Sequence, residues 1–512
     1  MPRRGTQLGG TEGDPLAGCT RSHFRVRWGS ARRSPFVVPP MRLLLLLAVS
    51  LAVLPSVVAA DRPVSFIAEV APILKENCLA CHDAKKRNGK YDMTTFEKLL
   101  LGGVNGEAIV PGKPDESDFH DLIVTAEDRR MPPRDKGEAV PADKARVVAE
   151  WIKQGAKLDA GLDPKADLVR ELRLRWTPPV PPVAYKYPAI VNALAFTPDG
   201  KSLVVGGHHE LTVWSVPEGV LTKRVRTRAE RAYALAFLPG GTLAVAGGRP
   251  GQEGDVRLYD LTAPGPTVGG VTMLDGVGDP KVMVKQLLDS DDSVLCLAVS
   301  PDGKTLAAGG CDRAVRLWDI GAGPASAKLT QTIENHADWV LGVAISADGK
   351  FLATAARDKT AKVWDLKAKE SVLTYPEHQQ IVYAVAFNKD ASLGYSVGGD
   401  SQLRTWKLAG EGKGVKALGG HGGDVFKVVA HPTKPVVATA SADKTVRLWD
   451  MDKAAALQTL TGPTDYVYAV AFSPDGGLVA GGTYNGEVTL WKHPGDGKPF
   501  KTFNATPGLP AK

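Results

Sequence analysis

The chain has 512 residues, of which 43% are apolar and 23% are charged. This composition is ordinary for a soluble globular protein, and the length predicts two or more folded units rather than one core. The net charge is +7, but residues 1–60 hold eight basic and two acidic residues, so the remainder carries about +1. This nearly neutral net charge argues against a basic protein that binds nucleic acid.

Residues 41–60 have the layout of a secretory signal peptide. Arg42 precedes about a dozen apolar residues, and small residues end the segment at Ala60. The apolar run is shorter than the roughly 18–20 residues that span a bilayer, so we expect cleavage after Ala60 and no stable membrane span. A signal peptide should start the chain, so we expect residues 1–40 to be a spurious extension. The mature protein is then expected in the periplasm or otherwise exported.

Residues 61–157 are expected to form a small, mostly α-helical domain. Ile67, Val70, Ile73 and Leu74 recur at helical spacing, and a second amphipathic helix runs through Trp151. Residues 158–188 are expected to be a connector, because five residues of mostly proline, 178–182, favour a stiff extended spacer.

A CxxCH motif, Cys78-Leu79-Ala80-Cys81-His82, follows the first of these helices. Two thiols can add across the vinyl groups of a haem while the adjacent His binds the iron. A zinc half-site would need another Cys or His pair nearby, and the one candidate is the isolated His120. A thioredoxin-like pair would need a βαβ context. Export adds weight to one covalent haem c, because this haem is attached outside the cytoplasm.

The sixth iron ligand is predicted to be Met131. It is followed by Pro132-Pro133, so its thioether would lie on a stiff loop. A His82/Met131 pair favours low-spin electron transfer and a raised reduction potential. Met93 and His120 are the alternatives.

From residue 189 to 505 the chain repeats itself. Each unit is a set of apolar strands whose third strand closes on an aromatic residue, with spacings of about 42 to 59 residues. The closing residues are Trp214, Tyr259, Trp318, Trp364, Trp406, Trp449 and Trp491. Seven units at this period predict a seven-bladed WD-repeat β-propeller. We expect an insertion near residues 263–290 and the outer strand of blade seven within 498–503.

Three units share a set of polar residues at fixed positions. His336, His378 and His421 lie 28 residues before their Trp; Asp358, Asp400 and Asp443 lie six before it; Thr354, Ser396 and Thr439 lie four before the Asp. We expect them to form the hydrogen-bonded structural tetrad of WD repeats rather than metal sites. Blade three has Ser290 at the His position, and blade seven has Pro463 and Asn485 at the His and Asp positions.

Cys296 and Cys311 lie in strand-like segments on either side of a Pro-Asp-Gly turn. A disulfide is compatible with an oxidising compartment, and so are two small buried thiols.

Residues 64–156 resemble the planctomycete-type cytochrome c domain. The resemblance is carried in order by Cys78 to His82, Gly102-Gly103, Ile109 to Pro114, Arg130-Met131-Pro132-Pro133 and Trp151 to Ala156. It differs at Asn88 to Asp92, where the family usually has a Gly-Gly-Leu-Arg-Leu-type segment. Chains of this family often join the domain to WD repeats. The resemblance implies an exported haem protein of a planctomycete-like bacterium and no particular substrate.

Three functions fit these features. The first is a non-enzymatic electron carrier, with a redox partner protein and a second protein docked on the propeller. The second is a periplasmic redox enzyme whose propeller holds a second cofactor, although such enzymes have eight blades. The third is a haem-based sensor. The sequence favours the first, because no catalytic nucleophile–base set stands out in the repeats.

Overall fold

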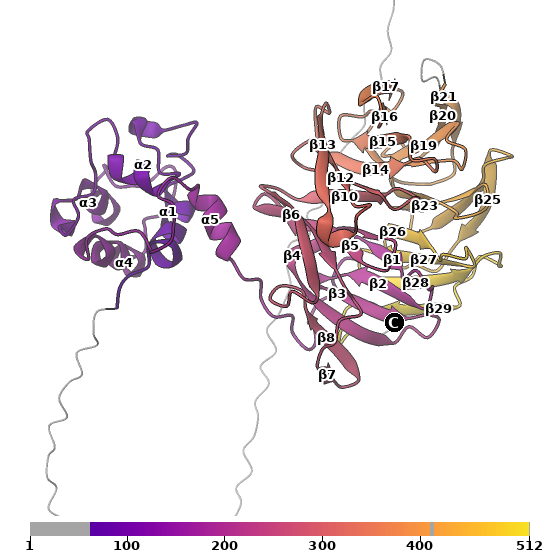
Figure 1. Ribbon diagram of the computed structural model, residues 1–512, viewed down its shortest axis with the longest axis horizontal. Helices are drawn as coiled ribbons and strands as arrows, with labels where there is room; N and C mark the ends of the chain where they lie inside the picture. The colour runs from indigo at the N-terminus through magenta and orange to yellow at the C-terminus, as the bar shows by residue number, and fades with distance from the viewer. Residues whose placement is uncertain (1–61, 410–413, 511–512) are drawn as a thin grey trace, which may run out of the picture. The chain divides into compact units, whose positions relative to one another are not determined.

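The computed structural model describes residues 62–409 and 414–510. This part of the chain contains a helical region followed by a large all-β region (Figure 1). The predicted signal peptide, 41–60, and the predicted extension, 1–40, lie outside the described residues. Among the described residues, no helix is long and apolar enough to cross a bilayer.

The helical region consists of short helices joined by long loops. They are η1 Phe66–Val70, α1 Ala71–Asn77, η2 Asn88–Lys90, α2 Phe96–Leu101, η3 Pro114–Glu116, α3 Asp118–Val124, α4 Ala142–Lys153 and α5 Leu168–Arg175. Side-chain caps fix three of the starts: Ser65, Thr95 and Asp167 each accept a hydrogen bond from the backbone N–H three residues ahead. Such caps satisfy amide groups that have no partner within the helix.

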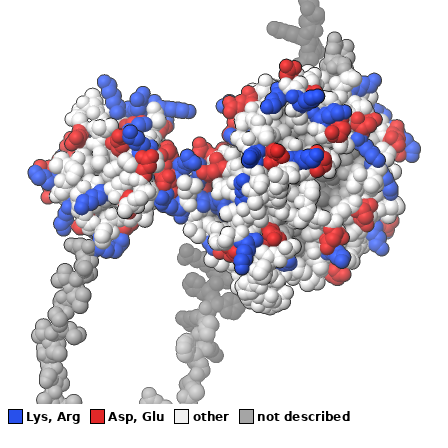
Figure 2. Space-filling model, in the orientation of Figure 1, with Lys and Arg blue, Asp and Glu red and all other residues white. Residues whose placement is uncertain are grey.

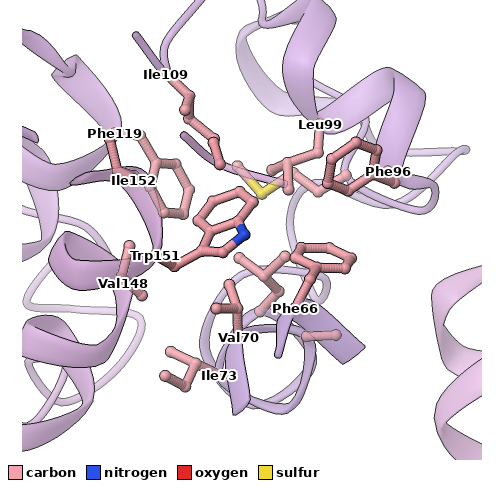
Figure 3. Packing of buried hydrophobic residues seen from close by; sticks show 14 of the residues in the cluster. Phe66, Val70, Ile73, Phe96, Leu99, Ile109, Phe119, Val148, Trp151 and Ile152 are labelled. Atoms are coloured by element: carbon pink, nitrogen blue, oxygen red, sulfur yellow. The ribbon is translucent and has the colours of Figure 1, made fainter. Parts of the chain in front are cut away.

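The core of this region is built around Trp151 of α4 (Figure 3). Its ring centroid lies 5.3 Å from that of Phe66 and 6.4 Å from that of Phe96, and all three side chains are buried. The indole Nε1 donates to the Lys157 carbonyl at 2.9 Å, so the polar edge of the ring is also satisfied. Helices η1, α2 and α4 are thereby joined through one aromatic cluster.

The predicted connector, 158–188, is more structured than a spacer. It contains helix α5, whose Leu168 is buried in the core of the helical region. After it, Arg228 donates to the Trp176 carbonyl at 3.0 Å, and Arg224 donates to the Pro182 carbonyl at 2.7 Å. The guanidinium of Arg249 lies 3.6 Å from the centre of the Trp176 ring. Helix α5 is too short, and too rich in charged residues, to be recognised from the sequence.

The β region contains six sheets that make seven blades, and the strands within each blade are antiparallel. Blade 1 is β1 Leu194–Phe196, β2 Ser202–Gly206, β3 His208–Ser215 and the start of β4 Leu221–Phe237. Blade 2 is the end of β4, β5 Leu243–Arg249, β6 Glu253–Tyr259 and β9 Met283–Ser290. Blade 3 is β10 Val294–Val299, β11 Thr305–Gly310, β12 Ala314–Asp319 and β13 Lys328–Glu334, preceded by the single turn η4 Pro324–Ser326.

The other four blades are regular four-stranded sheets. Blade 4 is β14 Val340–Ile345, β15 Phe351–Ala356, β16 Ala361–Asp365 and β17 Glu370–Tyr375. Blade 5 is β18 Val382–Phe387, β19 Leu393–Gly398, β20 Leu403–Lys407 and β21 Gly414–Leu418. Blade 6 is β22 Val425–Ala430, β23 Val436–Ser441, β24 Val446–Asp450 and β25 Ala455–Leu460. Blade 7 is β26 Val467–Phe472, β27 Leu478–Thr483, β28 Glu487–Lys492 and β29 Lys501–Asn504. The predicted fold class, a small helical domain followed by a seven-bladed WD-repeat propeller, is confirmed.

Blades 1 and 2 form a single sheet because β4 runs through both. Its first part pairs with β3, and its last part pairs with β5. The insertion predicted near residues 263–290 lies before residue 283, since residues 283–290 are the outer strand of blade 2. The inserted hairpin, β7 Thr267–Val268 and β8 Val271–Asp275, places β8 parallel to β4 at the edge of blade 1.

The ring closes between blades 7 and 1. Apolar side chains of both blades form one buried cluster, which includes Val191, Trp214 and Phe503. The Val191 N–H donates to the Thr483 carbonyl at 3.0 Å. Strand β29 supplies the outer edge of blade 7, as the sequence predicts, and each end blade is complete from its own stretch of chain.

The expected tetrads are present in blades 4, 5 and 6. In blade 5, His378 lies 3.1 Å from Asp400 and 2.7 Å from the Ser396 hydroxyl, to which Trp406 donates at 3.1 Å. The same contacts join His336, Asp358, Thr354 and Trp364 in blade 4, and His421, Asp443, Thr439 and Trp449 in blade 6. The three histidines therefore serve the packing of the blades.

Blades 1 and 2 bury arginine–carboxylate ion pairs. Arg224 and Glu210 form two hydrogen bonds, at 2.6 and 2.8 Å, and Arg257 donates to Asp255 at 2.6 Å. In blade 7, Asn485 bonds Thr483 and Thr464 instead. These partners compensate for the cost of burying polar groups.

Cys296 and Cys311 are both free thiols. Burial raises the pKa of each to about 12. The interpretation as two thiols, rather than a disulfide, is the one that the structure supports.

The tetrad carboxylates should make the stability of the propeller sensitive to acid. Burial raises the pKa of Asp400, but hydrogen bonds from His378 and Arg404 outweigh it and lower the value to about 2. A carboxyl with a lowered pKa in the folded state adds stability above its unfolded pKa, and loses it as the pH falls through the folded value. Asp400→Asn should therefore lower the free energy of unfolding by roughly 2 kcal/mol at pH 7, and the difference should shrink between about pH 4 and 2.

Thermal unfolding followed by circular dichroism across this pH range measures the effect. The exposed Asp452 provides the matched control, since Asp452→Asn removes the same charge from the surface of blade 6. Equal destabilisation by the two variants would contradict the prediction.

Candidate functional site

Four residues predicted to hold a haem line one pocket of the helical region. They are Cys78, Cys81, His82 and Met131. Most of the other lining side chains are apolar, among them Phe119, Leu122 and Ile123. The pocket therefore combines two thiols, an imidazole and a thioether with walls suited to an apolar macrocycle.

Helix α1 positions the CxxCH motif. The Cys78 amide donates to the Leu74 carbonyl at 2.8 Å, which places Cys78 directly after the last turn of the helix. The His82 amide then donates to the Cys78 carbonyl at 3.1 Å, so the motif forms a further tight turn. Both thiols and the imidazole thus come from one compact loop.

The imidazole of His82 is oriented by a backbone carbonyl. Its Nδ1 lies 3.3 Å from the oxygen of Tyr91, which can accept a hydrogen bond but cannot donate one. The Nδ1–H tautomer is therefore required, and the lone pair of Nε2 is left for a metal. Such a second contact fixes the ring and increases the basicity of the ligating nitrogen.

The thiol of Cys78 does not resemble a redox nucleophile. Burial, with a smaller contribution from Cys81, raises its pKa to about 12. A reactive dithiol has at least one thiolate stabilised at neutral pH. This environment favours a covalent structural use of the sulfur over thioredoxin-like chemistry.

Met131 reaches the pocket on a loop that follows α3. Its amide donates to the Leu122 carbonyl at 2.7 Å, and the neighbouring Arg130 donates to the Gly137 carbonyl at 3.0 Å. Met131 is 38% exposed, so its thioether lies at the surface end of the pocket. Two hydrogen bonds thus hold the loop at Met131 and Arg130, in keeping with the stiff loop that Pro132-Pro133 predict.

The two alternative ligands have different positions. Met93 also lines the pocket but is only 4% exposed, and its amide donates to the His82 carbonyl at 2.9 Å. His120 lines a different pocket, with residues of α4. Of the three candidates, Met131 and Met93 remain near the CxxCH motif.

The loop after α2 folds back tightly on itself at the pocket wall. Gly102 has φ +77°, and a Cβ there would lie 1.8 Å from the Gly106 oxygen. The Val104 amide donates to the Gly89 carbonyl at 2.7 Å, which joins this loop to the segment after the motif. Gly102 belongs to the predicted motif set, and the close approach gives its physical reason.

Several pocket residues carry no sequence signal of their own. Tyr91 contributes a carbonyl, which any residue would supply. The apolar side of the short helix α3 carries Phe119, Leu122 and Ile123. The sequence does not indicate that this side lines a pocket as well as packing in the core.

The donor set fits a haem better than a bare metal ion. Among the described residues, no group of three or more His, Cys, Asp or Glu side chains could hold a metal. One imidazole and one thioether provide two ligands, and a porphyrin would provide the other four. Cys78 and Cys81 come from the same compact loop as His82 and line the same pocket, as covalent attachment requires.

Both regions of the chain match models of known protein families. Residues 78–135 match the family model described as Planctomycete cytochrome C. The model described as WD domain, G-beta repeat matches residues 282–319, 327–365, 369–407, 412–450 and 455–492. These five matches end at the third strands of blades 3 to 7.

Curated relatives share parts of the chain. Periodic tryptophan protein 2 homolog of Mus musculus is 39% identical over 203 residues, which is 39% of this chain and 21% of that protein. Eukaryotic translation initiation factor 3 subunit I of Pyricularia oryzae is 37% identical over 106 residues, 21% of this chain and 30% of that protein. Protein groucho of Drosophila melanogaster is 26% identical over 136 residues, which is 26% of this chain and 16% of that protein. The chain spans less than a third of each relative.

Gly102→Ala should destabilise the helical region strongly. The new Cβ would overlap the Gly106 oxygen, and the backbone conformation itself disfavours a side chain, so we expect a loss of at least about 3 kcal/mol. Gly112→Ala is the matched control, because Gly112 also has a positive φ, +85°, but open space around its Cβ position.

The control should lose only about 1 kcal/mol, from the backbone conformation alone. Chemical denaturation followed by tryptophan fluorescence measures both variants. Similar losses for the two would show that the close contact between Gly102 and Gly106 does not matter.

Proposed function

We propose that this protein, which joins a Planctomycete cytochrome c domain to a WD-repeat propeller, is an exported electron carrier with one covalent haem c. Cys78 and Cys81 attach the haem, and His82 and Met131 bind its iron. One observation carries the proposal: the thiols, the imidazole and the thioether line one pocket, although Met131 lies far along the chain from the motif.

When bound, the haem supplies a one-electron ferric/ferrous couple. The chain's own residues orient and shield it. The Tyr91 carbonyl holds the His82 ring, and the hydrogen-bonded loop around Arg130 holds Met131. Apolar side chains exclude water from most of the pocket, which favours a raised potential.

A non-enzymatic role is favoured over catalysis for the propeller. His336, His378 and His421 are occupied in structural hydrogen bonds. The enzymes that join a cytochrome c domain to a cofactor-bearing propeller have eight blades, whereas this ring has seven. We therefore propose the propeller as a docking scaffold for a second protein.

Exposed aromatic side chains support the docking role. Trp339 and Tyr466 occupy the same position, just before the innermost strands of blades 4 and 7, and are 40% and 44% exposed. Tyr484, whose amide donates to the Tyr466 carbonyl, is 50% exposed. Aromatic residues are enriched at the energetic centres of protein interfaces.

Covalent attachment gives the first test. The chain expressed from Met41 in a bacterium that matures c-type cytochromes should retain haem through denaturing electrophoresis. Cys78→Ala combined with Cys81→Ala should abolish this signal, because no thioether can form. Haem that stays covalently bound to the double variant, or an unmodified chain that carries none, would contradict the proposal.

Ligand substitution gives the second test. Met131→Ala should remove the low-spin methionine-ligated spectrum of the haem and lower its reduction potential by on the order of 0.1 V. His120→Ala is the control, since His120 lines a different pocket, and its spectrum should match that of the unmodified protein. An unchanged spectrum in Met131→Ala, with a change in Met93→Ala, would assign the ligand to Met93 instead.

A further inference from the structure

We propose that the central channel of the propeller binds a small anion, chloride or a short carboxylate, on the ammonium group of Lys427. A propeller encloses such a channel along the innermost strands of its blades. Lys427 lies on β22, the innermost strand of blade 6. The site belongs to the propeller alone, so it depends neither on the haem nor on a docked protein.

The innermost strands of blades 2 to 7 each have a bulge near their start. In blade 6, Val425 pairs with Ser441, and the next paired residue is Lys427. The equivalent residue of blade 1 is Ala193, whose carbonyl accepts a hydrogen bond from the Gly206 amide. The seven post-bulge residues are Ala193, Ala234, Cys296, Gly342, Ala384, Lys427 and Ala469. Lys427 is therefore the one long, charged side chain in a ring of small ones.

Close packing between neighbouring blades explains the small side chains. A Cβ on Gly342 would lie 3.0 Å from the backbone oxygen of Tyr383 in the next blade. The sulfur of Cys296 likewise lies 3.7 Å from the Val340 carbonyl oxygen in the next blade. The gap between innermost strands thus holds only one or two side-chain atoms at this position. The long side chain of Lys427 must extend out of this gap, and the channel is the space beside it.

The electrostatic neighbour of Lys427 supports this placement. The charge of Lys427 acts on the thiol of Cys296, which lies on the innermost strand of blade 3. The innermost strands contact one another in ring order, so two blades separate blade 3 from blade 6 on one side and three on the other. The two side chains therefore interact across the channel rather than along its wall.

Lys427 has no counter-ion in the part of the chain that the structure describes. None of the described residues forms an ion pair or a hydrogen bond with its ammonium group, and Cys296 is the one titratable group among them whose charge reaches it. Burial raises the pKa of that thiol to about 12, so the thiol is neutral at physiological pH. The surface of the propeller differs, because its Lys and Arg side chains lie among Asp and Glu side chains (Figure 2).

An ammonium group without a partner is costly to enclose in protein. Burial lowers the pKa of Lys427, because the charged form loses hydration that no protein group replaces. A bound anion would supply the missing partner. Strand β22 also contributes, because it pairs only with β23 within its blade, and the outer edge of such a strand presents backbone N–H groups. An ammonium group beside backbone N–H groups is a donor set that suits chloride or a carboxylate.

A row of aromatic side chains lies next to the site. Tyr383, Phe426 and Tyr468 occupy the residue just before the post-bulge position in blades 5, 6 and 7. The ring centroid of Phe426 lies 5.4 Å from that of Tyr383 and 4.5 Å from that of Tyr468. These rings narrow the approach to Lys427 along this side of the channel, so we expect the site to admit chloride or formate and to exclude bulky anions.

The test compares the unmodified full-length protein with Lys427→Met, which keeps an unbranched apolar side chain and removes the charge. Lys434→Met is the matched control, because Lys434 is an exposed lysine of the same blade and its loss changes the net charge equally. Thermal unfolding is followed by tryptophan fluorescence in sodium chloride, sodium formate and sodium gluconate, each at about 0.15 M, so that screening of surface charges is the same. Gluconate is the bulky anion.

Chloride and formate should each raise the unfolding midpoint of the unmodified protein by about 3 °C relative to gluconate, because a ligand that binds only the folded state stabilises it. Lys434→Met should show the same shift, and Lys427→Met should show none. In gluconate, Lys427→Met should unfold at a higher temperature than the unmodified protein, because the variant lacks an unpaired buried charge. Crystals of the unmodified protein grown in sodium bromide should show an anomalous peak beside the Lys427 Nζ.

A chloride shift of the same size in Lys427→Met would overturn the proposal, because the anion would then act elsewhere. Equal midpoints of the unmodified protein in chloride and gluconate would overturn it as well, and so would a channel without bromide. The bromide peak and the chloride shift are measured on the unmodified protein, so they decide the question even where Lys427→Met fails to fold.

Discussion

The burial of Trp151 against Phe66 and Phe96 is the contact on which the haem pocket depends. The helix that carries Phe66 runs on into α1, which ends at Cys78, and Trp151 lies on α4 near the end of the domain. Burying an aromatic side chain of this size contributes on the order of 3–5 kcal/mol. The two ends of the domain are joined by this cluster, so the segments between them are left to surround a ligand.

The propeller depends on a different constraint, which is that every blade must satisfy the polar groups that it buries. Three blades use the His–Asp–Ser/Thr–Trp chain, and the lowered pKa of Asp400 shows how strongly the charged form is held. Blades 1 and 2 meet the same need with arginine–carboxylate pairs such as Arg224 with Glu210. Such pairs recover little net free energy once their dehydration is counted, but removing either partner would be costly.

Fixed spacing explains what the sequence could predict. The CxxCH motif, the Met131 loop and the tetrads of blades 4 to 6 depend on side-chain identities at set intervals, and the structure brings those residues together. The orientation of His82 depends on a carbonyl, and backbone atoms leave no trace in a sequence. Helix α5 could not be predicted because it has only eight residues and half of them are charged. Leu168 is buried, whereas its helical neighbour Leu172 is only partly buried. The length of β4 could not be predicted from the sequence either, because its basic first half and its apolar second half resemble two separate strands.

The shared strand β4 has a consequence for how the ring opens. A single backbone ladder passes from blade 1 into blade 2, so these two blades cannot separate without breaking main-chain hydrogen bonds along one continuous strand. Elsewhere, neighbouring blades are separate sheets, and between blades 7 and 1 the two ends of the propeller chain meet. Under mechanical load or partial unfolding, the seam between blades 7 and 1 is therefore the first to part, and blades 1 and 2 behave as one cooperative unit.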